Sequence, residues 1–199
     1  MNKLQGLLTD LTSGDESRAE RAVPALIELG EDAIPALMEL TKSPNADSRW
    51  WALRVLAASP HSSTGWLIRF LDDSAPEVRQ CAALGLAEKA DEAATESLVR
   101  AMNDDDEMVC NLAAHALVKI GKPAVPSLIE AAKRRPEHVE GNESQAVRIH
   151  AIRALAEIKD YRAIPVLMQV IEEDSAALGY WAKEGLERLG LDMVYLKPV

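Results

Sequence analysis

The sequence is poor in aromatic residues, in cysteine and in basic charge. Only 4% of its 199 residues are aromatic, and acidic residues outnumber basic ones by 32 to 22, for a formal net charge of -10. A nucleic-acid backbone requires a concentrated basic face, so this balance argues against a nucleic-acid binder. We expect a chain that is soluble and does not bind nucleic acid.

Long apolar runs are also lacking. No stretch approaches the roughly 18 apolar residues of a membrane span, and MNKLQGLLTDLTSGDES at the N-terminus has no apolar core of a signal peptide. The two cysteines, Cys81 and Cys110, fall on neighbouring helices. Packed helices lie about 8–10 Å apart, too far for a disulfide. These features predict a cytoplasmic protein with free thiols and no membrane contact.

Catalytic and metal-binding motifs are missing as well. The sequence has no HExxH, GxSxG, CxxC or glycine-rich phosphate loop. None of the histidines His61, His115, His138 and His150 is followed by Glu. The acidic run Asp104–Glu107 matches acidic turns elsewhere and is expected to cap the next helix. We therefore expect no metal, no cofactor and no enzymatic activity.

What the sequence does contain is an internal repeat. Three similar segments are VRQCAALGLAEKADEAATESLVRAM, VCNLAAHALVKIGKPAVPSLIEA and VRIHAIRALAEIKDYRAIPVLMQVI, and the period is about 30 residues. Each holds two stretches with helical periodicity. Pro35, Pro126 and Pro165 recur in the first turn of the second helix, where a missing N–H costs little. One such hairpin cannot bury its apolar face alone, so stacked neighbours must share a core.

These segments resemble the short HEAT-like repeats shared with phycobilisome lyase subunits. The resemblance covers about residues 16–190 and implies an all-α fold, a right-handed α-α superhelix (solenoid) of about five to six helical hairpins. We expect one solenoid over 1–199. Its parts would be an N-terminal cap helix at 1–15, repeats at 16–45, 46–74, 75–105, 106–144 and 145–174, and a C-terminal cap at 175–199, where LDMVYLKPV covers the last face.

The family's Val-Arg pair survives as Val78-Arg79 and Val147-Arg148, and Arg49 keeps the Arg alone. The resemblance implies that this Arg braces the turn between repeats. Cys110 replaces it in the fourth repeat, where the joint is expected to be looser.

The second helices line the concave groove in stacks of this kind, and their outward positions are mixed in sign. Trp66 stands where other repeats carry Ala, Ser or Val, and Trp beside Arg is typical of interface hot spots. Either Trp66 contacts a partner or it fills a gap between repeats, and the charged set is either a binding surface or a solvated face. The candidate groove residues are Trp66, Arg69, Arg100, Glu130 and Lys133.

Trp50 and Trp51 are adjacent in the stretch SRWWALR. The repeat register places Trp51 at the edge of the packed face and Trp50 outward on the convex side. Arg54, one turn later, could cover Trp50 by a cation–π contact. Trp50 is then either a covered surface ring or, with Arg54, a convex binding site.

The fourth repeat carries the insertion KRRPEHVEGNES, which is either a tolerated loop or a recognition finger. The candidate residues of this insertion loop are Arg134, Arg135 and His138. Whether the inserted stretch 135–144 has a function is left open by the sequence.

The sequence favours a non-catalytic scaffold or adaptor that binds another protein through its groove, as a monomer or weak dimer. The resemblance alone implies the main alternative, an accessory subunit or chaperone of a bilin (tetrapyrrole) lyase. A HEAT-like DNA glycosylase is a third reading, which the acidic balance opposes.

Overall fold

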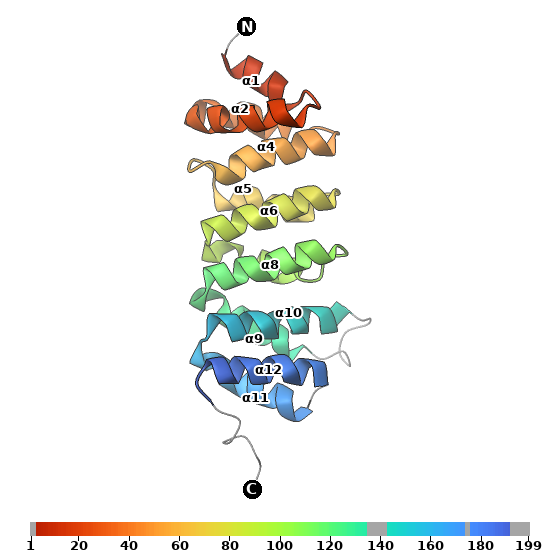
Figure 1. Cartoon of the computed structure of the whole chain (residues 1–199), viewed down its shortest axis with the longest axis vertical. Helices are drawn as coiled ribbons and strands as arrows, with labels where there is room; N and C mark the ends of the chain where they lie inside the picture. Colours follow the sequence, from red (N-terminus) through yellow and green to blue (C-terminus); the bar gives the residue numbers. More distant parts are fainter. Residues whose placement is uncertain (1–2, 135–142, 174–175, 192–199) are drawn as a thin grey trace. The chain divides into compact units, whose positions relative to one another are not determined.

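The described part of the chain consists of helices joined by short turns. The computed structural model describes residues 3–134, 143–173 and 176–191, and no β-strand occurs in these ranges. The helices cluster into two units, Met1–Lys89 and Ala90–Val199. The predicted all-α class of stacked helical hairpins is confirmed within each unit (Figure 1).

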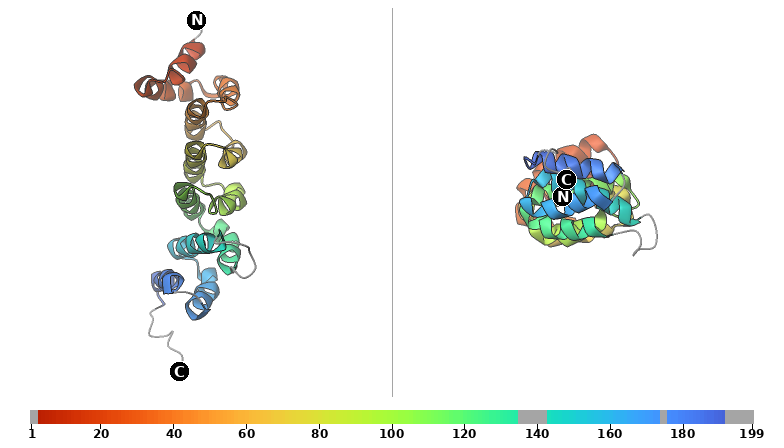
Figure 2. Two further views of the ribbon diagram at one scale, coloured as in Figure 1. Left: turned by 90° about the vertical axis from the view of Figure 1, so that its right-hand side faces the viewer. Right: turned by 90° about the horizontal axis from the view of Figure 1, so that it is seen from below.

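The first unit begins with a lone helix that packs against the first hairpin. Its elements are α1 (Lys3–Leu11), α2 (Glu16–Glu28), η1 (Gly30–Asp32), α3 (Ile34–Leu40), α4 (Ala46–Ala58), α5 (Thr64–Ile68), η2 (Arg69–Asp72) and α6 (Pro76–Lys89). Here η marks a 3-10 helix. The first helices α2, α4 and α6 lie side by side, and α3 and α5 form a second layer behind them (Figure 2).

The second unit repeats this arrangement, and the last helix of its described residues is a first helix. Its elements are η3 (Glu92–Ala94), α7 (Thr95–Ala101), α8 (Glu107–Ile120), η4 (Lys122–Ala124), α9 (Val125–Lys133), α10 (Glu143–Ile158), η6 (Tyr161–Ala163), α11 (Ile164–Glu173) and α12 (Ala176–Arg188). Helices α8, α10 and α12 pack in sequence against one another. The predicted covering role of LDMVYLKPV falls almost wholly outside the described residues.

Side-chain caps explain where several helices begin. Asp15, Asn45 and Asp106 accept hydrogen bonds from the backbone N–H three residues later, at the starts of α2, α4 and α8. Such caps satisfy N–H groups that have no partner inside the helix. Because Asp106 belongs to the run Asp104–Glu107, the prediction that this run caps the next helix is confirmed.

Prolines mark the starts of second helices. Pro35, Pro126 and Pro165 lie in the first turns of α3, α9 and α11, as predicted. The second helix of the second repeat is shorter. It ends as α5 at Ile68, and the chain continues as a 3-10 turn from Arg69. Tightening of a final helical turn into 3-10 geometry is common.

Apolar side chains facing the neighbouring helices form the core of each unit. Leu53, Leu56 and Leu86 are fully buried in the first unit, and Leu117 and Ile152 in the second. Burial of a Leu or Ile side chain contributes about 1.5–3 kcal/mol each. This shared core lets short hairpins, each unable to bury its own face, form a stable stack.

Arginines join successive repeats as the resemblance implied. Arg49 donates from Nε and Nη2 to the Asp73 carboxylate at 2.9 and 2.7 Å, with both side chains almost buried. The pKa of Asp73 is lowered; burial alone would raise it, but hydrogen bonds from Arg49 and from the Ala75 backbone, with nearby cationic charge, prevail. Arg79 donates to the Asp73 carbonyl at 2.9 Å, and Arg148 to the Ala132 carbonyl at 2.9 Å.

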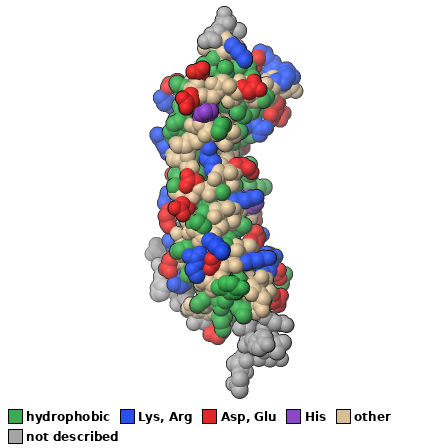
Figure 3. Space-filling model, turned by 90° about the vertical axis from the view of Figure 1, so that its left-hand side faces the viewer, with side chains coloured by type: hydrophobic (Ala, Val, Ile, Leu, Met, Phe, Trp, Pro, Cys, Tyr) green, Lys and Arg blue, Asp and Glu red, His purple; other side chains and the backbone are tan. Residues whose placement is uncertain are grey.

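The surface is mixed in charge. Acidic and basic side chains are interspersed on the face shown in Figure 3. Within the described residues, no helix combines the length and the apolar character needed to cross a membrane.

Candidate functional site

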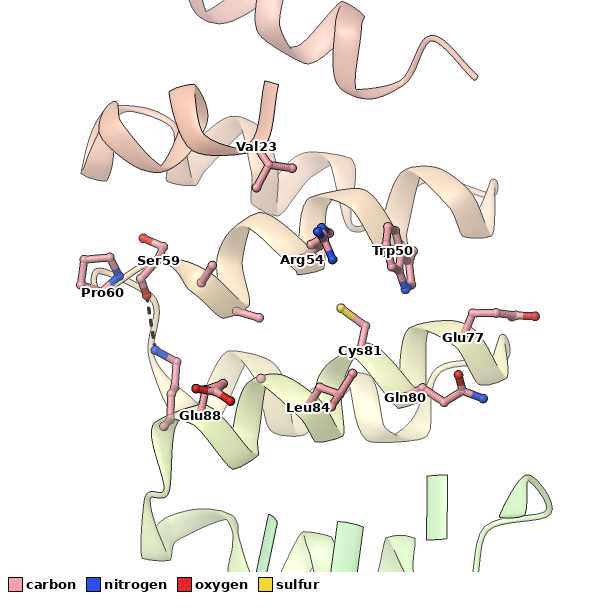
Figure 4. A pocket seen from close by; sticks show the side chains of 14 residues that line it. Val23, Trp50, Arg54, Ser59, Pro60, Glu77, Gln80, Cys81, Leu84 and Glu88 are labelled. Atoms are coloured by element: carbon pink, nitrogen blue, oxygen red, sulfur yellow. Dashed lines mark hydrogen bonds between the residues drawn. The ribbon is translucent and has the colours of Figure 1, made fainter. Parts of the chain in front are cut away.

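A cleft of about 720 Å³ opens between α4 and α6 on the side of the first helices. Its walls come from α4, from the turn at Ser59 and Pro60, and from α6, with Val23 of α2 at one margin (Figure 4). Its volume is within the range of roughly 300–1,000 Å³ that is usual for small-molecule sites. The cleft lies entirely within the first unit.

Trp50 and Arg54 form the α4 wall. The Trp50 and Trp51 rings meet edge to face, with centroids 4.7 Å apart. The Arg54 guanidinium carbon lies 5.4 Å from the Trp50 centroid and 5.9 Å from that of Trp51. The cation–π contact predicted for Arg54 is thus present, and it reaches both rings.

The neighbouring Trp51 has a different environment. Its ring packs against the apolar core of the first unit, as the repeat register predicted, whereas Trp50 lines the cleft. The register therefore separates the environments of the two rings, although the rings touch each other.

Cys81, Leu84 and Gly85 line the α6 side. Leu84 is a large apolar side chain with 50% of its surface exposed. A Cβ at Gly85 would come within 2.6 Å of the Ala57 Cβ. The absence of that Cβ lets α4 and α6 approach closely where Gly85 faces Ala57.

The Cys81 thiol points toward α4 (Figure 4) but is suited to remain protonated. Burial raises its pKa to about 12, and the nearby Arg54 charge offsets only part of that effect. A nucleophilic cysteine needs a thiolate, which a low pKa provides. Cys81 is therefore an apolar lining group rather than an attacking one.

Charged groups frame the cleft. Lys89 is already engaged, because its Nζ donates to the Ser59 and Ser62 carbonyls at 3.4 and 3.0 Å. Glu77 and Glu88 are exposed. Arg54 donates from Nη2 to Glu20 of α2 at 3.0 Å, while its buried Nε has no hydrogen-bond partner among the described residues. The arrangement can hold a flat apolar body beside a cation.

The predicted groove residues lie on the second helices. In the first unit, Trp66 of α5 is half-buried and Arg69 of η2 is exposed. In the second, Arg100 donates to its own helix at Glu96 and Ser97. Lys133 pairs with Glu130 at 2.8 Å. Partner binding by these residues stays a prediction.

Of the predicted insertion residues, Arg134 is exposed directly after α9. Arg135 and His138 lie outside the described residues, as does most of the 135–144 stretch.

Sequence reasoning identified Trp50 and Arg54 but missed the opposite wall. Cys81, Leu84, Gly85 and Lys89 belong to the next repeat, so no short motif joins them to Trp50. Two signals were available: a Leu in an outward position at Leu84, and a Gly inside a helix at Gly85, where Ala would favour the helix.

Comparison with known proteins places the chain among helical-repeat proteins. The family model for HEAT repeats matches residues 63–140 and 137–195. A chain in the solved structure of the complex of CpcE and CpcF of phycocyanin lyase from Nostoc sp. PCC7120 has a similar fold. The TM-score is 0.54 at 24% identity, and the match covers 74% of this chain and 96% of that chain.

Two curated proteins are similar in sequence. The bilin biosynthesis protein RpcF of Synechococcus sp. (strain WH8020) is 38% identical over 84 residues, or 41% of this chain. That match spans only 40% of the length of RpcF. The uncharacterized phycocyanin operon protein Z of Pseudanabaena tenuis (strain PCC 7409) is 29% identical over 154 residues, 73% of each chain.

These similarities contradict the expectation of a chain without enzymatic activity. One relative is a bilin biosynthesis protein, and a chain from a phycocyanin lyase complex has a similar fold. The expectation was wrong because it rested on missing catalytic motifs. A site assembled from neighbouring repeats has its groups about 30 residues apart and leaves no short motif.

Proposed function

The chain belongs to the HEAT-repeat family, and on that premise we propose that it is a bilin-handling subunit of a lyase. In this role it holds an open-chain tetrapyrrole in the cleft between α4 and α6. This is the function that was the alternative in the sequence analysis. The non-catalytic scaffold reading is not retained.

The observation that carries the proposal is the match between the cleft and the chemistry of a bilin. A bilin has a flat, conjugated, mostly apolar body and two propionate side chains. Trp50 and Leu84 offer apolar surface on opposite walls of the cleft. Arg54 supplies a cation beside that surface. Sites for small molecules combine a mostly apolar lining with a few placed polar groups in this way.

Each wall contributes to holding the ligand. The Trp50 indole provides an aromatic face or edge against which a conjugated system can stack. Leu84 and Ala57 exclude water from the apolar edge of the ligand. The protonated Cys81 thiol lets the bilin lie beside it without forming a thioether, so the bilin stays available for transfer to another protein.

Binding of a bilin is tested directly by absorbance. Titrating the chain with biliverdin is expected to shift and sharpen its visible band, with saturation at one bilin per chain. Trp50→Leu should weaken binding by about tenfold, since base or ring stacking on one aromatic side chain contributes about 1–3 kcal/mol.

The matched control is Tyr180→Leu. Tyr180 also touches the following Trp edge to face, with centroids 5.2 Å apart, but it lies on α12, outside the cleft. Its loss should leave binding unchanged. An unchanged biliverdin spectrum at all concentrations would refute the proposed function, and equal weakening by both variants would refute the site.

A subunit of a lyase needs a protein partner, and the CpcE and CpcF proteins of phycocyanin lyase do form a complex. We propose that such a partner contacts the second-helix side at Trp66 and Arg69, which is separate from the cleft. Trp66 remains partly exposed and Arg69 is exposed, so both side chains are available for contact.

A further inference from the structure

Arg54 is held by only part of its hydrogen-bonding capacity. Its Nη2 lies 3.0 Å from both Oε1 and Oε2 of Glu20. Its Nε is buried and makes no hydrogen bond within the described residues. Nη2 thus makes both contacts with the Glu20 carboxylate, while the neighbouring donor Nε makes none.

This geometry is weaker than the one that arginine and a carboxylate prefer. Two parallel N–H···O bonds, one to each carboxylate oxygen, give the strongest and most specific pairing. A buried donor without a partner is costly, because it has lost its water and gained nothing. The present pair is also half-exposed, with 41% of the Arg54 side chain and 43% of the Glu20 side chain accessible, and such pairs contribute little.

The location of Arg54 makes the unused donor relevant to binding. Arg54 lines the cleft, and its guanidinium lies over Trp50. The other cation of the lining, Lys89, already donates to two backbone carbonyls. A carboxylate entering beside Trp50 would therefore meet Arg54 as the available partner.

We propose that Arg54 selects ligands bearing a carboxylate, which displaces Glu20 and, once the released guanidinium turns its buried Nε toward the cleft, pairs with both Nε and Nη2. Glu20 is then an internal competitor that holds Arg54 in the free protein and is released on binding. This inference rests on the proposed function, because it names the part of the bilin that the cleft recognises. It makes the propionate the specificity determinant, with the conjugated body contributing affinity.

The test compares biliverdin with its dimethyl ester, which keeps the conjugated body and removes both carboxylates. In the wild-type chain the acid is expected to bind about tenfold or more tightly than the ester, as for loss of a hydrogen bond to a charged group. Dissociation constants follow from absorbance titrations at one salt concentration.

Two substitutions separate the partners. Glu20→Gln removes the competing charge and should tighten biliverdin binding about threefold, as expected for a half-exposed ion pair, while ester binding stays the same. Arg54→Met should reduce the affinity for biliverdin to that for the ester.

The control is Arg153→Met. Arg153 also covers a tryptophan, with its guanidinium carbon 4.8 Å from the Trp181 centroid, but it lies on α10. It should leave both affinities unchanged. Far-ultraviolet circular dichroism and thermal unfolding identify any variant that has lost its fold, and the acid-to-ester comparison in the wild-type chain needs no variant.

The outcomes distinguish this inference from the proposed function. If the acid and the ester bind equally to the wild-type chain, the role of Arg54 is refuted and bilin binding stands. If neither binds, the proposed function fails, and this inference with it. A preference for the acid that Arg54→Met leaves intact would also overturn the assignment, since another group would then read the carboxylate.

Discussion

Cys81 lines the cleft, but its thiol is expected to be unreactive. Its side chain is only 8% exposed, and burial raises the pKa of its thiol to about 12. At neutral pH almost no thiolate is available to attack a bilin or an alkylating reagent. Its position in the cleft therefore does not make Cys81 a nucleophile.

We expect Cys81 to resist alkylation in the folded chain. At pH 8, iodoacetamide should modify it at least about a hundredfold more slowly than a model thiol, because the reagent reacts with the thiolate. Peptide mass spectrometry after timed quenching measures the rate. Denaturation in guanidinium is the control and should make both cysteines reactive.

The raised pKa of the Cys81 thiol also makes the stability of the fold depend on pH. The thiol pKa is 9.0 in the unfolded chain and about 12 in the folded one. The contribution of the protonated thiol is therefore complete below pH 9 and is lost as the pH rises toward 12. Rapid alkylation at pH 8, or a Cys81→Ala variant that no longer binds biliverdin, would contradict the passive role.

At the scale of elements, the repeats meet at joints built from similar positions. Arg79 donates to the Asp73 carbonyl at 2.9 Å. In the next repeat Cys110 takes the place of the Arg, and its Sγ lies 3.2 Å from the Asp104 carbonyl. The same kind of acceptor is met by a much weaker donor. Whether this joint is looser, as the sequence predicts, remains a prediction.

The close approach of α4 and α6 depends on Gly85. Gly85→Ala should destabilise the first unit by about 1–3 kcal/mol, as overpacking of a core does, because the new Cβ would lie 2.6 Å from the Ala57 Cβ. Urea unfolding measures this change. In a Trp181→Phe background all remaining tryptophans belong to the first unit, so their fluorescence reports on that unit.

The matched control is Gly65→Ala, in α5 of the same unit. A Cβ at Gly65 would meet nothing within 4 Å, so this change should cost nothing and could add up to about 1 kcal/mol from helix propensity. If Gly85→Ala proved as harmless as Gly65→Ala, the close approach of α4 and α6 would not depend on that glycine.

The hairpins could be predicted from the sequence and the cleft could not. The hairpins follow from local signals in the sequence, such as helical periodicity and residues that mark helix starts. Asp106 caps α8 and Pro126 lies in the first turn of α9, as the sequence predicts. The cleft arises from the spacing of two helices one repeat apart, which depends on packing at Ala57 and Gly85. Trp50 was identified because its register position points outward, but what faces it is set by the neighbouring repeat.

At the scale of the whole molecule, the charge distribution bears on the kind of partner. The chain has a net charge of -10. Two cations on the second-helix side pair with an acidic residue three positions earlier. Lys42, just after α3, pairs with Glu39 at 2.6 Å, and Lys133 of α9 pairs with Glu130 at 2.8 Å. A nucleic-acid surface would instead present unpaired cations in a row. On this pattern we expect a protein rather than a nucleic acid as the partner.

We expect a protein partner to contact the chain through Trp66 and Arg69. The tagged chain is used as bait in a nuclease-treated extract of its host, and captured proteins are quantified by mass spectrometry. Trp66→Ala with Arg69→Ala should reduce the specific partner at least about tenfold, because Trp and Arg anchors at interfaces often cost 2 kcal/mol or more on truncation.

Lys42→Ala is the matched control, because it also removes a cation from the second-helix side but one that is paired with Glu39. It should leave the captured partner unchanged. The double variant should also still bind biliverdin, since neither residue lines the cleft. An unchanged partner list in the double variant would refute this contact surface. A partner captured from an untreated extract but not from the nuclease-treated one would show that nucleic acid mediates the contact.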